Sequence, residues 1–181
     1  MKKSILISAF TIAFIILSST DVCAQKFDGL DKSPMDIASY PSIHDDSNTQ
    51  IKIVYSRPQL KGRSLSKLIP NDKIWRTGAN EASEITFYKD VKFGGKAVKQ
   101  GTYSLATIPG EKEWTIILNS AVNAWGAYSY KESNDVARIK IPVSHEKKSL
   151  EAFSIAFQKT DKGVNMFLAW DTLRIVVPIV N

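Results

Sequence analysis

The densest group of side chains that could do chemistry lies between Trp75 and Glu81, where the sequence reads Trp-Arg-Thr-Gly-Ala-Asn-Glu. Arg76 offers a planar guanidinium that can clamp a carboxylate or a phosphate through two parallel hydrogen bonds. Asn80 and Glu81 could bind a sugar hydroxyl or ligate a hard cation, and the indole of Trp75 could stack on a ligand ring. We therefore take Trp75, Arg76, Thr77, Asn80 and Glu81 as candidate ligand-binding residues.

The same loop can also be interpreted as a structural brace. Trp75 could plug the core, Gly78 could supply a turn with positive φ, and Asn80 could brace the loop. An internal ion pair between Arg76 and Glu81 would then account for both charges. The residue types alone leave the two interpretations open.

A second candidate loop joins aromatic and amide side chains between Asn119 and Tyr130. Aromatic rings beside amides are what a carbohydrate-binding surface needs, so Trp125 and Tyr128 complete our set of candidate ligand-binding residues. The alternative is that these rings cover the core as lids.

A third candidate is a small basic patch in which Ser56-Arg57-Pro58 is followed by Lys61 and Arg63. It could meet phosphates or uronates, or it could be an ordinary solvated surface. The formal net charge is +6, but the basic residues are spread along the chain and form no arm of the kind that binds nucleic acid. We therefore expect no nucleic-acid partner.

Motifs for catalysis and for cofactors are missing from the sequence. The only two histidines, His44 and His145, do not stand in the H-E-x-x-H spacing of a zinc site. There is no G-x-S-x-G nucleophile turn, no phosphate-binding P-loop and no dinucleotide fingerprint. The sequence thus predicts neither a cofactor nor a metal.

A pair of carboxylates for glycoside cleavage stays open. Glu81 and Glu84 could lie close together, with Asp90 or Glu113 as further partners. If the protein is an enzyme, Glu81 is the candidate catalytic acid or base, and Arg76 would orient the substrate. An exposed Glu81 would count against this interpretation.

Residues 1–24 have the organisation of a secretory signal peptide. Lys2 and Lys3 precede an apolar run from Ile5 to Leu17, which is too short for a comfortable membrane span. Val22 and Ala24 then occupy the −3 and −1 positions of a small-residue cleavage site. We expect cleavage after residue 24, export to the periplasm or outside the cell, and no membrane span afterwards.

The single cysteine, Cys23, lies at the end of this signal. The residues before it do not form a lipobox, so we do not expect lipidation. Cleavage would remove Cys23, which excludes disulfides, thiol nucleophiles and thiolate metal ligands from the mature chain. An uncleaved membrane anchor is the alternative that the short apolar run disfavours.

Beyond the signal, residues 25–50 show no apolar period and predict an irregular N-terminal arm. From residue 51 onward, apolar and polar side chains alternate in eight or nine short runs separated by turns such as Gly94-Gly95. One short helical turn is expected near Leu65, and there is no long amphipathic helix. The pattern predicts a single all-β domain over residues 51–181, an antiparallel β-sandwich or a flattened barrel.

The end of the chain predicts two linked strands with Asp171-Thr172 between them. Pro178 lies in the second of these strands. Because proline has no N–H to donate, we expect that strand to lie at a sheet edge or to end early.

One set of strings spans nearly all of the chain beyond the signal. They are Asp31–Asp36, Ser56-Arg57-Pro58, Lys61-Gly62-Arg63, Trp75–Glu81, Gly101–Leu105, Ile108-Pro109-Gly110, Glu113-Trp114-Thr115, Asn119, Trp125-Gly126 and Leu168-Ala169-Trp170. Together they closely resemble the bacterial domain-of-unknown-function family 2911, and the Trp75–Glu81 string is the most specific of them. The resemblance implies an exported bacterial protein and brings no assigned activity with it.

We therefore expect an exported binding or structural module of the bacterial cell envelope that holds a polar ligand such as a glycan. The alternative is a carboxylate-based hydrolase that acts on an envelope or extracellular substrate. The sequence favours the binding module, because no catalytic set is recognisable. It gives no indication of the oligomeric state.

Overall fold

The computed structural model describes residues 25–42, 44 and 48–180. The predicted signal peptide lies outside these residues. Residues 25–30 form a unit of their own without regular secondary structure, and the compact domain begins at Asp31. Within the described residues, no helix is both long enough and apolar enough to span a bilayer.

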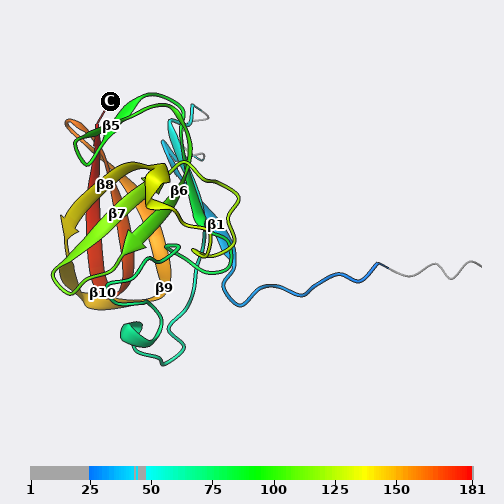
Figure 1. The fold of residues 1–181 in the computed structure, drawn as a ribbon. Helices are drawn as coiled ribbons and strands as arrows, with labels where there is room; N and C mark the ends of the chain where they lie inside the picture. Colours follow the sequence, from blue (N-terminus) through cyan, green and yellow to red (C-terminus); the bar gives the residue numbers. More distant parts are fainter. Residues whose placement is uncertain (1–24, 43, 45–47, 181) are drawn as a thin grey trace, which may run out of the picture. The chain divides into compact units, whose positions relative to one another are not determined.

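The domain is an all-β sandwich of two antiparallel sheets (Figure 1). The six-stranded sheet has the order β1 (Met35–Tyr40), β2 (Ile51–Ser56), β3 (Ser83–Phe87), β6 (Gly101–Ile108), β7 (Glu113–Asn119) and β8 (Asp135–Pro142). The four-stranded sheet has the order β5 (Lys96–Val98), β4 (Val91–Phe93), β10 (Gly163–Val180) and β9 (Ser144–Thr160). The predicted sandwich is confirmed, the sheets do not close into a barrel, and the described chain has ten strands.

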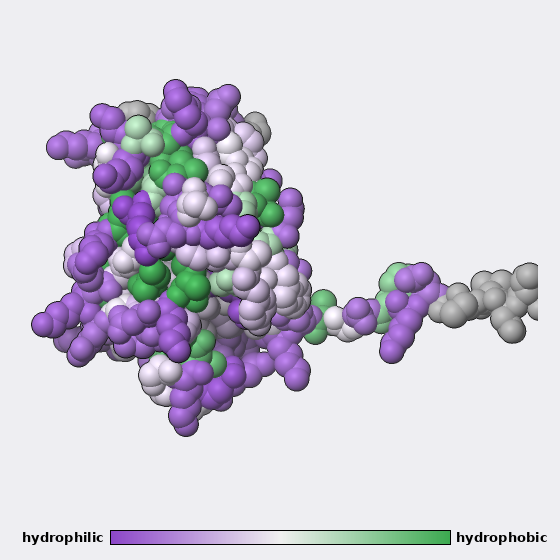
Figure 2. Space-filling model, viewed as in Figure 1, coloured by the Kyte–Doolittle hydropathy of each residue, from purple (hydrophilic) through white to green (hydrophobic). Residues whose placement is uncertain are grey.

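Alternating side chains put the core between the two sheets. In β2, Ile51, Ile53 and Tyr55 are buried, whereas Lys52 and Val54 between them are only partly covered. Each apolar side chain buried in this way contributes about 1.5–3 kcal/mol relative to an exposed one. The outer surface is largely hydrophilic, and its apolar areas are small and separate in the view of Figure 2.

Four aromatic residues from different parts of the chain pack together in this core. The ring of Trp75 lies 5.9 Å from Trp114 and 5.4 Å from Phe153, both edge to face. It stacks on Trp170 at 6.2 Å with an angle of 16° between the ring planes. Trp75 is only 5% exposed, so its indole is mainly a part of the core.

Arg57 ties the two sheets together where β2 ends. Its guanidinium pairs with Asp36 of β1 at 2.8 Å. It also donates to the backbone oxygen of Phe153 at 3.1 Å and to the Ser154 hydroxyl at 2.8 Å, both in β9. Arg57 of the predicted basic patch therefore serves as an internal brace.

The predicted irregular arm contains strand β1, which differs from our expectation. Met35 and Ile37, on one face of the strand, are 55% and 53% exposed. Ala38 and Tyr40 on the other face pack against the core but are only partly buried, so alternation in the sequence is too weak to indicate the strand. Pairing with β2, for example Ile37 opposite Val54, holds it in the sheet.

The two strands expected around Asp171-Thr172 are one continuous strand, β10, which carries a bulge. Asp171 has a φ of 50°, and the register with β9 shifts on either side of it. Pro178 lies in this strand, which has β4 on one side and β9 on the other and is therefore not the edge strand that we expected. The paired residues of β9 end opposite Arg174 and those of β4 begin opposite Ile179, which leaves a position that a proline can occupy.

Candidate functional site

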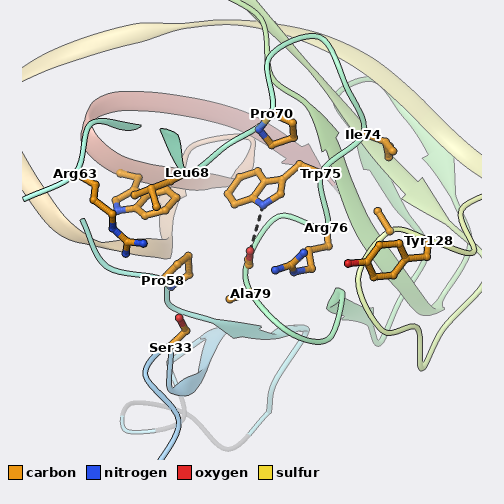
Figure 3. Close-up of a pocket in the computed structure, with 13 residues that line it drawn as sticks. Ser33, Pro58, Arg63, Leu68, Pro70, Ile74, Trp75, Arg76, Ala79 and Tyr128 are labelled. Atoms are coloured by element: carbon orange, nitrogen blue, oxygen red, sulfur yellow. Dashed lines mark hydrogen bonds between the residues drawn. The ribbon is translucent and has the colours of Figure 1, made fainter. Parts of the chain in front are cut away.

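A cavity of about 460 Å³ opens beside the aromatic cluster (Figure 3). Its walls come from the segment before β1, from the connection between β2 and β3, from the loop after β7 and from β10. The lining residues are Ser33, Pro58, Arg63, Leu68, Pro70, Ile74, Trp75, Arg76, Gly78, Ala79, Ala127, Tyr128 and Trp170. The volume is in the range of cavities that hold small ligands. Three of the lining residues, Trp75, Arg76 and Tyr128, are candidates that we selected from the sequence.

The loop that carries Arg76 is fixed on both sides of this residue. The backbone of Trp75 exchanges two hydrogen bonds with Thr107 of β6, at 2.7 and 2.9 Å. The hydroxyl of Thr77 donates to the Thr107 hydroxyl at 3.1 Å, and Ser83 donates to the Thr77 carbonyl at 2.7 Å. Thr77 is fully buried and does not line the cavity, so it holds the loop in place.

The guanidinium of Arg76 has no partner in the described part of the chain. Its Nε atom is buried and makes no hydrogen bond, and none of the ion pairs formed there involves Arg76. The predicted pair with Glu81 is therefore absent, because the Glu81 side chain is exposed and lines a different pocket. A buried donor without a partner is unfavourable. Arg76 lines this cavity and also a second, smaller pocket beside Asn119 and Tyr130.

Gly78 differs from the predicted positive-φ turn. Positive φ values occur instead at Thr77, with 56°, and at Asn80, with 59°. A Cβ atom on Gly78 would lie 3.1 Å from the Ser83 hydroxyl and 3.2 Å from the Ser56 carbonyl. The glycine is thus explained by close approach to β2 and β3 rather than by its backbone angles.

The two candidate loops meet through backbone hydrogen bonds. Gly126 donates to the carbonyl of Asn80 at 3.0 Å, and Glu81 forms an isolated bridge with Trp125. Trp125 is 61% exposed and Tyr128 is 86% exposed, so neither ring is a lid on the core. Tyr128 lies at the cavity wall near Arg76 (Figure 3), whereas Asn80, Glu81 and Trp125 do not line the cavity.

A hydrogen-bonded cluster anchors the base of the second loop. Asn119 donates to the carboxylate of Asp135 at 2.8 Å, and the Tyr130 hydroxyl donates to the same carboxylate at 2.8 Å. Arg138 pairs with Asp135 at 2.9 Å. Burial and the hydrogen bond to Asp135 raise the pKa of Tyr130 to about 12.

The carboxylates that we considered for hydrolysis do not gather around Arg76. Glu81 and Glu84 line a separate pocket of about 190 Å³. One oxygen of Glu84 already accepts a hydrogen bond from the Asn123 backbone. A catalytic Glu81 with a substrate-orienting Arg76 is therefore not formed in this structure.

The other two carboxylates are paired with lysines at the surface. Asp90 lies 2.7 Å from Lys99, and Glu113 lies 2.6 Å from Lys140. The hydrogen bond from Lys99 lowers the pKa of Asp90. Among the residues that the structure describes, no three His, Cys, Asp or Glu side chains come together in a way that could hold a metal ion.

We predicted Arg63 only as part of a basic surface patch, but this residue lines the cavity. Its guanidinium donates to the carbonyls of Leu60 at 2.9 Å and Gln59 at 2.8 Å. Ser33 and Trp170 were not among our candidates. They come from distant parts of the chain, and only their place in the strings that resemble the family could have indicated them.

Residues 33–179 match the model of a family described as proteins of unknown function, DUF2911. The chain belongs to this family. The match extends from Ser33 at one cavity wall past Trp170 at the other, so it includes every residue that lines the cavity. No curated protein and no solved structure matches the chain.

Proposed function

We propose that this protein is an exported binding protein of the cell envelope and that its cavity holds a small anionic ligand. Export is supported by the signal-peptide pattern of residues 1–24. The anionic ligand is supported above all by Arg76, which lines the cavity and whose guanidinium, including its buried Nε atom, has no partner among the described residues.

The surroundings of Arg76 suit an anion. No Asp or Glu occurs among the described residues that line the cavity, whereas both Arg63 and Arg76 do. Hydrogen bonds from a guanidinium to a carboxylate or a phosphate are charge-assisted and stronger than those between neutral groups. The fixed backbone on both sides of Arg76 reduces the entropy that binding would otherwise lose.

Binding of cyclohexanecarboxylate, glucuronate and inorganic phosphate, measured by calorimetry and by tryptophan fluorescence, tests this proposal. We expect at least one of these anions to bind, and Arg76→Gln to weaken that binding roughly ten- to a hundredfold, since a charged hydrogen bond contributes about 1.5–3 kcal/mol.

The matched control is Lys92→Gln. Lys92 is an exposed residue of β4 that does not line the cavity. This variant removes the same charge elsewhere and should leave the affinity unchanged. The proposal fails if none of the three anions binds, or if the two variants lower the affinity equally, which would indicate general attraction to a basic protein.

A further inference from the structure

We infer that the anionic ligand has an apolar body, so that its chemical class is a carboxylate carried on an apolar ring rather than an acidic saccharide. The inference rests on the proposed function and concerns the same cavity. It departs from the glycan that the sequence led us to expect, and it follows from the groups that the cavity offers.

Acceptors for hydroxyl groups are scarce in the cavity. A saccharide presents several hydroxyls, and each needs an acceptor for its proton when it leaves water. The described lining residues include no Asp, Glu, Asn, Gln or His. Among side chains, only the hydroxyls of Ser33 and Tyr128 can accept, so most hydroxyls of a buried sugar ring would have to rely on backbone carbonyls.

The donors of the two lining indoles are already used. Nε1 of Trp75 donates to the carbonyl of Gly78 at 3.2 Å. Nε1 of Trp170 donates to the carbonyl of Glu151 at 3.1 Å. The free polar capacity of the side chains is therefore concentrated in the Arg76 guanidinium, the N–H groups that Arg63 does not donate to Leu60 and Gln59, and the two hydroxyls.

The remaining wall is apolar and rigid. Pro58, Leu68, Pro70 and Ile74 line the cavity and have no polar side-chain atoms. Pro58, Leu68 and Pro70 lie around the Trp75 ring in Figure 3. Proline rings have no rotamers to lose, and Trp75 is fixed by its stacking on Trp170. A wall of this kind favours a rigid ring that buries apolar surface while its carboxylate meets Arg76.

Three probes of the same ring size separate the contributions. Cyclohexanecarboxylate carries the anion on an apolar ring, glucuronate carries it on a hydroxylated ring, and cyclohexylmethanol has the apolar ring without the charge. Calorimetry with the purified protein should show cyclohexanecarboxylate binding at least tenfold more tightly than either of the other two.

The variant Ile74→Thr adds one hydroxyl to the wall while keeping the branched shape. It should weaken cyclohexanecarboxylate several-fold and leave glucuronate unchanged, and its fluorescence spectrum and melting temperature would report whether the fold is intact. If glucuronate binds as tightly as cyclohexanecarboxylate or more tightly, the apolar ligand class is wrong while the anion site stands. If inorganic phosphate binds and neither carboxylate does, the apolar ligand class is likewise wrong while the anion site stands. If none of the three anions binds, or if cyclohexylmethanol binds as well as cyclohexanecarboxylate, the proposed function fails as well.

Discussion

Replacing Trp75 with alanine should destabilise the domain far more than the same change at Trp125. Trp75 is 5% exposed and packs against three aromatic rings, whereas Trp125 is 61% exposed at the surface. The pair of variants removes the same side chain from a buried and from an exposed position. The difference therefore measures what the core gains from the Trp75 indole.

The expected magnitude follows from these contacts. Truncating a buried tryptophan to alanine lowers the free energy of unfolding by about 3–5 kcal/mol, because the transfer free energy is lost and a cavity remains. Trp75→Ala also removes the hydrogen bond from Nε1 to Gly78, so we expect the upper part of this range. For a domain of this size the melting temperature should fall by roughly 6–20 °C.

Trp125→Ala should change the free energy of unfolding by less than about 0.5 kcal/mol, as surface substitutions usually do. Urea denaturation followed by far-UV circular dichroism measures both variants. Equal losses for the two variants, or a loss below about 1 kcal/mol for Trp75→Ala, would refute the conclusion that Trp75 is mainly a core residue.

Two further predictions concern the loop after β7. Spectrophotometric titration should find one phenol with a pKa near 12 that moves to lower pH in Asp135→Asn, because burial and the bond to Asp135 hold the proton on Tyr130. Since an unfolded tyrosine ionises near pH 10, the contribution of Tyr130 to the free energy of unfolding is complete below pH 10 and is lost as the pH rises towards 12. A phenol titration that Asp135→Asn does not alter would contradict the role of Asp135 in raising the pKa of Tyr130. Gly126→Ala should cost about 1–3 kcal/mol in urea denaturation, because Gly126 has a φ of 69°. The same variant should also weaken the binding of cyclohexanecarboxylate measured by calorimetry, because the new Cβ atom would lie 2.7 Å from the Tyr128 ring. Unchanged binding would show that the Tyr128 ring does not shape the cavity.

Alternation of side chains was sufficient to predict most of the sandwich. Strands such as β2 and β3 have one buried face, and turns such as Gly94-Gly95 separate short strands as expected. Strand β1 could not be predicted from alternation, because its Met35 and Ile37 are exposed and the strand is held by its pairing with β2. The continuity of β10 could not be predicted either, because the bulge at Asp171 contains the same residue types as a turn.

The candidate site could be predicted only in part. Arg76 and Tyr128 were selected for their chemistry, and both line the cavity. Burial could not be predicted for Trp75 and Trp125, since the same residue type occupies a core position and a surface position. The other walls, including Pro58 and Trp170, depend on contacts between strands that are distant in the sequence, and local patterns carry no information about them.

The cavity is built from residues that span the chain from Ser33 to Trp170. Trp170 of β10 is one of these residues, so the cavity is complete only when the C-terminal hairpin of β9 and β10 is in place. A ligand in the cavity would bind the native state and not the unfolded chain, and would stabilise the native state by mass action. Resistance to proteolysis that increases with ligand concentration would then report ligand occupancy and complete folding in a single measurement.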